Sequence, residues 1–111
     1  MSADAFVVFY GTALPLAESE VTSCEERTHP LIKAAREARL NTYWADFIPN
    51  DDQGPELLIG KKIGVFGLEG EISADVGRDN IEAVMNAVDT FLNTHGLATS
   101  GKLIIRFCQD I

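Results

Sequence analysis

Residues 79–96, DNIEAVMNAVDTFLNTHG, form the element that the sequence predicts most clearly. Apolar residues recur there at spacings of three and four, which is the pattern of one buried stripe of a helix. They are Ile81, Val84, Met85, Val88, Phe91 and Leu92. Asp79 and Glu82 have the spacing of a capping box, and Gly96 is the residue type that ends a helix in the left-handed conformation. We therefore expect a long amphipathic helix that packs this stripe against the core.

A second stripe of the same helix consists of small residues, at positions 83, 87, 90 and 94. Thr28, His29 and Pro30 indicate the start of another helix, because proline is tolerated in the first turn. That helix carries alanines at positions 34, 35 and 38. Since small side chains let two helices approach closely, we expect these two helices to lie side by side.

Four segments predict strands. Residues 5–10 (AFVVFY) and 102–108 (KLIIRFC) are apolar at both alternating sets of positions, which is typical of strands buried on both faces. Residues 41–48 (NTYWADFI) are rich in strand formers, and 49–55 form a loop. Residues 56–66 form either one bent strand or two short ones, and Gly60 favours a hairpin with a type II′ turn.

The resulting order is strand, helix, strand, strand, helix, strand, with the third strand either intact or split. This βαββαβ order predicts an α+β, two-layer ferredoxin-like sandwich, in which both helices cover one face of an antiparallel sheet. A chain of 111 residues suits one domain, so we expect residues 1–111 to form a single unit.

Charge and composition exclude several classes of partner. The chain is 46% hydrophobic and 23% charged, which is ordinary globular usage, and its net charge is −8. This charge repels nucleic acid phosphates and anionic membranes. No apolar run reaches the ~20 residues of a membrane span, and residues 1–4 lack the positive region of a signal peptide. With Cys24 and Cys108 far apart in sequence, we expect a reduced, cytoplasmic protein.

Chemical motifs are weak. Gly60-Lys61-Lys62 lacks the other residues of a phosphate-binding loop, and the acidic residues lack the spacing of a calcium loop. Cys24 and His29 could act as nucleophile and base, but Cys24 is better interpreted as a core residue and His29 as the start of a helix. The basic residues at 27, 33, 36 and 39 suit a solvated helix face better than a phosphate site. We therefore assign no catalytic residue, no metal and no cofactor.

Aromatic residues are the most suggestive set. A two-layer sandwich leaves one sheet face without helices, and the strands predicted here would expose apolar side chains on it. Either a second subunit or a small apolar ligand would then cover that face. Tyr10, Trp44 and Phe66 are the candidate ligand-binding residues, and Tyr10 and Trp44 are natural anchors of a dimer interface.

In element order and length the chain resembles the dimeric α/β-barrel group of small ferredoxin-like proteins, whose subunits pair through their open sheets. No motif matches an active site of that group, so the resemblance assigns no residue a role. Three hypotheses stay open. The first is a non-catalytic binding or interaction domain that forms a homodimer through its open sheet face. The second is a small-molecule-binding protein or enzyme of the dimeric α/β-barrel type. The third is an acidic, immunity-like inhibitor of a basic target.

Overall fold

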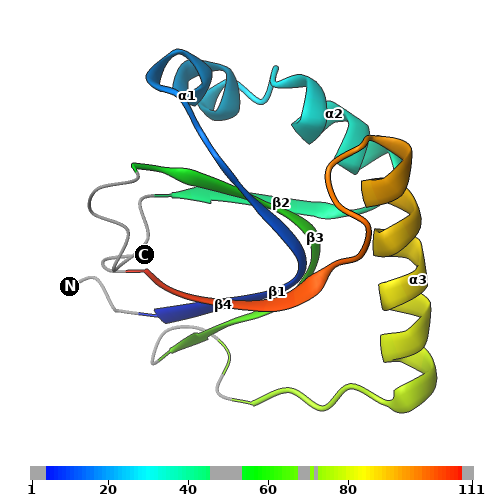
Figure 1. Cartoon of the computed structure of the whole chain (residues 1–111). Coiled ribbons are helices and arrows are strands. Elements are labelled where there is room, and N and C mark those ends of the chain that lie inside the picture. Colours follow the sequence, from blue (N-terminus) through cyan, green and yellow to red (C-terminus); the bar gives the residue numbers. More distant parts are fainter. Residues whose placement is uncertain (1–4, 46–53, 68–70, 72, 109–111) are drawn as a thin grey trace.

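Four antiparallel strands form one sheet, in the order β2-β3-β1-β4. The computed structural model describes residues 5–45, 54–67, 71 and 73–108. The strands are β1 (Ala5–Pro15), β2 (Asn41–Ala45), β3 (Glu56–Gly67) and β4 (Lys102–Cys108), and the helices are α1 (Glu18–Glu25), α2 (Pro30–Glu37) and α3 (Arg78–Thr94). In Figure 1, α1 and α2 lie at one end of the curved sheet and α3 lies along one side. The predicted α+β class is confirmed, and the described residues are consistent with a two-layer sandwich.

Two helices, rather than one, connect β1 with β2. The helix expected near Pro30 is α2, and His29 is its N-cap residue, as predicted. The preceding α1 is a further eight-residue helix, which the predicted βαββαβ order does not include. The strand expected over residues 41–48 extends to Ala45 in β2, and its last three residues lie outside the described part of the chain.

Helix α3 confirms the main sequence prediction but not its first turn. The N-cap residue is Gly77, and no side chain caps the helix there. The predicted capping box is wrong because the helix begins before Asp79, which lies inside its first turn. The end is as predicted: Gly96 has φ +66°, and the N–H of Leu97 donates to the carbonyl of Leu92. This bond is the 6→1 bond of a Schellman motif.

Only the C-terminal half of the apolar stripe of α3 is fully buried. Val88, Phe91 and Leu92 are buried, whereas Ile81 and Met85 are more than a third exposed. The small residues at positions 83, 87, 90 and 94 are exposed too, so the predicted packing of this stripe against α2 is wrong. Instead, α2 packs on β2 and β3, and α3 packs mainly on β1 and β3.

Strand β3 is continuous, so neither the hairpin at Gly60 nor the split of the third strand occurs. Gly60 lies opposite Gly11 in the pairing of β1 with β3. A Cβ on Gly60 would overlap the carbonyl of Tyr10, and a Cβ on Gly11 would overlap the carbonyl of Ile59. The two glycines therefore allow two backbones to cross closely, and they do not make a turn. Strand β1 accordingly continues past Gly11 to Pro15.

The sheet is strongly coiled, as an ion pair between two residues that are far apart in the sheet register shows. Nε of Arg106 lies 3.2 Å from Oε1 of Glu56. In the sheet register, Arg106 is opposite Val7 and Glu56 is opposite Pro15. Eight residues along a strand correspond to roughly 26 Å. The 3.2 Å contact is therefore reached because the sheet curls and brings these two side chains toward each other on its concave side (Figure 1).

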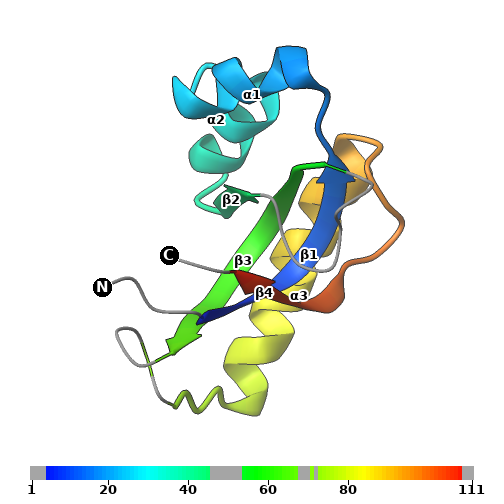
Figure 2. The ribbon, with the colours of Figure 1, turned by 90° about the vertical axis from the view of Figure 1, so that its left-hand side faces the viewer.

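The two faces of the sheet have separate cores. On the helix side, Tyr10, Leu57 and Ile59 pack with buried side chains of all three helices. On the concave side, Val7, Phe9, Leu58 and Ile104 pack together with other strand residues and are no more than 3% exposed. In Figure 2 the strands are in front and α3 is behind them. The expectation that the helix-free face would expose its apolar residues is wrong for these four side chains, since the curl of the sheet brings them together.

Candidate functional site

The three candidate ligand-binding residues lie on the helix side of the sheet, but not in one cleft. Tyr10 is on β1, Trp44 shares a register row with Leu14 of β1, and Phe66 is opposite Phe6. Positions 6, 10 and 14 follow one another on β1 at intervals of roughly 13 Å. The structure therefore distributes the three aromatic residues along the face, and each has different surroundings.

Tyr10 is buried and holds three elements together. Its hydroxyl donates to Oδ1 of Asp89 on α3, at 3.0 Å. The same carboxylate oxygen accepts from the N–H of Gly101, at 2.7 Å, in the loop that leads to β4. Burial, and then the hydrogen bond to Asp89, raise the pKa of the Tyr10 hydroxyl. This arrangement links β1, α3 and the last loop, which is a structural role.

Phe66 lies at the end of β3, beside an exposed apolar area. Four apolar side chains share the helix-side face of β1 and β4: Phe6, Leu103, Ile105 and Phe107. Phe6 pairs with Phe107, and positions 103, 105 and 107 alternate onto the same face of β4. We call these four residues the β4 patch. The rings of Phe6 and Phe107 are 5.2 Å apart, and Phe6, Leu103 and Ile105 are 49%, 62% and 55% exposed.

Trp44 lines a cavity of about 570 Å³ between α1, α2 and β2. Cys24 from α1 and Ile32 from α2 contribute buried apolar surface to it. Arg27, in the turn after α1, and Arg36, in the last turn of α2, also line it, and both residues are exposed. The lining thus combines an aromatic ring, apolar side chains and positive charge, which is the composition of many small-molecule sites.

Both arginines hold defined positions in the backbone. Arg27 has φ +59°, and the N–H of the next residue, Thr28, donates to the carbonyl of Ser23. This is again a Schellman motif, with arginine where glycine is usual. The left-handed conformation costs a residue with a Cβ roughly 1 kcal/mol. Among the described residues, neither Arg27 nor Arg36 forms an ion pair.

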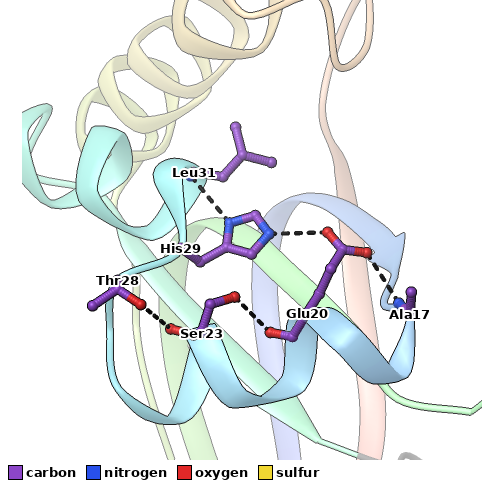
Figure 3. A network of polar contacts seen from close by, with 6 residues as sticks. All are labelled: Ala17, Glu20, Ser23, Thr28, His29 and Leu31. Atoms are coloured by element: carbon purple, nitrogen blue, oxygen red, sulfur yellow. Dashed lines mark hydrogen bonds and ion pairs between the residues drawn. The ribbon is translucent and has the colours of Figure 1, made fainter.

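Cys24 and His29 do not form a nucleophile and base. Burial, and then the charge of Glu20, raise the pKa of the Cys24 thiol, which favours the unreactive protonated form. Both ring nitrogens of His29 are already occupied (Figure 3). Nδ1 accepts from the N–H of Leu31 at 3.1 Å, so the proton of the neutral ring is on Nε2, which donates to Glu20 Oε2 at 3.1 Å.

Glu20 joins the start of α1 to His29. Its other carboxylate oxygen accepts from the N–H of Ala17, the N-cap residue of α1, at 3.0 Å. This backbone hydrogen bond is the main reason why the pKa of Glu20 is lowered, and the hydrogen bond to His29 adds to it. The network of Figure 3 therefore fixes the angle between α1 and α2, which form one wall of the cavity.

Comparisons with protein-family models, with curated proteins and with solved structures find no match for this chain. Over the described residues, no group of three or more histidine, cysteine, aspartate or glutamate side chains is arranged to hold a metal ion. Within the same residues, no helix is both long and apolar enough to span a membrane.

Sequence reasoning found Trp44 but missed its neighbours in the cavity. Arg36 is exposed, as expected, but its place at the cavity was not predicted, although it follows Ile32 by four residues and therefore lies on the same side of α2. That spacing was the available signal. Arg27 and Cys24 have no such signal, because only the path of the chain between α1 and α2 brings them to β2.

Proposed function

We propose that the protein is a non-catalytic interaction domain that self-associates through the β4 patch and the outer edge of β4, which pairs with no other strand among the described residues. The observation that carries this proposal is the 49–62% exposure of Phe6, Leu103 and Ile105 on and beside a strand at the edge of the sheet. Edge strands with exposed apolar residues tend to pair with another chain. Such an area is costly to leave in water, since apolar burial contributes about 25 cal/mol per Å².

The occupant that fits best is a second copy of the chain, because the sequence of β4 is self-complementary. An antiparallel pairing centred on Ile105 places Ile105 opposite its counterpart, and Leu103 opposite Phe107 of the second copy. Every pair on the helix-side face is then apolar. On the other face Arg106 lies opposite Ile104 of the second copy, so no two like charges oppose each other directly. A twofold axis generates this arrangement with identical surfaces on both copies.

The helices leave room for such a pairing. The contacts of α3 with the sheet are concentrated on β1 and β3, and the exposure of Ile81 and Met85 shows that the N-terminal half of α3 is not fully covered by its own sheet. In the paired assembly the two α3 helices lie on the same side of an eight-stranded sheet. A standard interface of about 800 Å² per partner would cover roughly a ninth of the 7084 Å² surface of the chain.

Charge modulates this association. Two copies with a net charge of −8 each repel one another, although β4 itself carries the basic residues Lys102 and Arg106. Salt screens the repulsion, so pairing should strengthen as ionic strength rises.

We extend the proposal to fold and compartment. The βαββαβ order, with an additional helix before β2, and a sheet with β1 and β3 at its centre support a ferredoxin-like topology. The buried, unpaired thiol of Cys24 fits a reducing compartment, which supports a cytoplasmic location.

Analytical ultracentrifugation of three proteins tests the function. The wild type should form a dimer between micromolar and near-millimolar concentrations. Ile105→Lys places a charge at the centre of the proposed interface and should give a folded monomer. Ala87→Lys makes the same charge change on an exposed position of α3 and should remain a dimer. A monomeric wild type at every concentration would contradict self-association, and a dimeric Ile105→Lys protein would contradict the surface.

A further inference from the structure

We propose that the cavity between α1, α2 and β2 binds a small organic monoanion, a carboxylate carried on an aromatic or branched apolar body. The site is separate from the β4 patch, since β2 and β4 are the opposite edges of the sheet. The proposal therefore goes beyond self-association and does not depend on it.

The apolar part of the ligand is specified by the inner wall of the cavity. Cys24 and Ile32 are 2% and 7% exposed, so they form an apolar floor of the cavity, and the neutral thiol adds no charge to it. Trp44 is partly buried and presents an aromatic ring from β2. A volume of about 570 Å³ lies within the range of about 300–1,000 Å³ that is usual for small-molecule sites.

The charged part of the ligand is specified by the charged residues that line the cavity. Arg27 and Arg36 bring two guanidinium groups, and Glu25 brings one carboxylate, so the three charged side chains of the lining sum to one positive charge. This balance matches one negative charge on the ligand better than two. Guanidinium groups bind carboxylates through two parallel hydrogen bonds, a geometry that a lysine cannot reproduce.

A purely structural role of the arginines leads to different predictions. Positive side chains near the C-terminal ends of helices interact favourably with the helix dipole, and both Arg27 and Arg36 have such positions. That role accounts for the residue type and requires no ligand. Only the proposed site predicts that binding depends on the charge of the ligand and on these two side chains.

The chain contains one tryptophan, and it lines the cavity, so tryptophan fluorescence reports on the site directly. The probes are 3-phenylpropionate, its neutral analogue 3-phenylpropionamide and inorganic phosphate. We expect 3-phenylpropionate to give a saturable change, the amide to bind about tenfold more weakly or not at all, and phosphate not to compete. Equal binding of acid and amide, competition by phosphate, or no saturable change with the acid would overturn the proposal.

Matched variants identify the residues. Arg36→Gln and Lys33→Gln remove the same charge from α2 at two exposed positions, but only Arg36 lines the cavity. We expect Arg36→Gln to weaken binding of 3-phenylpropionate by about tenfold and Lys33→Gln to leave it unchanged. Equal losses in both variants would show a general effect of charge and contradict the site.

Two further measurements keep the outcome interpretable. Arg36→Lys keeps the charge and the helix, so it should fold and bind with intermediate affinity, whereas full wild-type affinity would contradict the guanidinium contact. The monomeric Ile105→Lys protein should bind 3-phenylpropionate as the wild type does. Loss of binding there would place the ligand at the subunit interface and overturn the assignment to this cavity.

Discussion

Replacing Tyr10 by phenylalanine should destabilise the protein measurably, although it removes a single oxygen atom. The ring stays in the core, so no cavity forms there. What is lost is the 3.0 Å hydrogen bond from the Tyr10 hydroxyl to the carboxylate of Asp89. Asp89 keeps its 2.7 Å bond from the N–H of Gly101, so the carboxylate does not become unpaired.

The expected magnitude follows from these contacts. A hydrogen bond to a charged group contributes about 1.5–3 kcal/mol, and we take about 1.5 kcal/mol because Asp89 is only partly buried and water can replace the hydroxyl. For a domain of this size, that loss lowers the melting temperature by about 6 °C. With a urea m-value of about 1.5 kcal/mol per molar, the unfolding midpoint falls by about 1 M.

Urea unfolding of the wild type and four variants tests this reasoning. Asp89→Ala removes both hydrogen bonds and should cost about 3 kcal/mol. Asp89→Asn keeps an acceptor without the charge and should lie between Asp89→Ala and the wild type. Asp75→Asn makes the same charge change at an exposed position and should stay within about 0.5 kcal/mol of the wild type. A Tyr10→Phe protein with the wild-type midpoint would refute the link between β1 and α3.

Four other outcomes follow from the structure. Val88→Asp places an unpaired charge at a fully buried position of α3 and should cost several kcal/mol, so a soluble mutant with unchanged thermal melting would show that the helix is oriented differently. Gly11→Ala should unfold the sheet or shift its register, because the new Cβ meets the carbonyl of Ile59, and circular dichroism would detect the loss. The lowered pKa of Glu20 stabilises the folded state fully above the usual pKa of a carboxyl group, and this stabilisation is lost as the pH falls through the lowered pKa. The urea unfolding midpoint should therefore fall less steeply with decreasing pH in Glu20→Gln than in the wild type. Melting in the presence of a chelator should match melting without one, and a drop of many degrees would reveal a structural metal ion that we did not predict.

The fold class could be predicted because its signals are local. The apolar spacing of α3 and the continuous apolar runs in β1 and β4 need no knowledge of distant residues. The capping box failed because Asp79 and Glu82 satisfy the spacing rule two positions too far along the chain, and Gly77 takes the N-cap position instead.

The curvature of the sheet could not be predicted in this way. A glycine in an apolar run indicates either a turn or a close approach of two backbones, and only the pairing of Gly60 with Gly11 decides between them. The same curl buries Phe9 on the concave face and leaves Ile105 exposed on the helix side. Alternation identifies two faces of a strand, but the coiling of the whole sheet determines which of them meets water.

The cavity shows the same limit. Trp44 was identifiable from its residue type, and Arg36 from its spacing to Ile32. Arg27 reaches the site only through a turn in which arginine adopts the left-handed conformation of a glycine. No rule based on residue type would place an arginine there, so this part of the site depends on the tertiary structure.

Hydrogen exchange of the β4 backbone, measured at low and at high protein concentration, tests the proposed self-association most directly. We predict that amides of β4 become more protected as concentration rises, while those of α2 do not change. In Ile105→Lys the protection of β4 should stay at the low-concentration level throughout. Two results would contradict the proposed self-association. In the first, exchange in β4 is independent of concentration and the wild-type mass in solution stays at 12.1 kDa. In the second, a dimer forms but protects a segment other than β4.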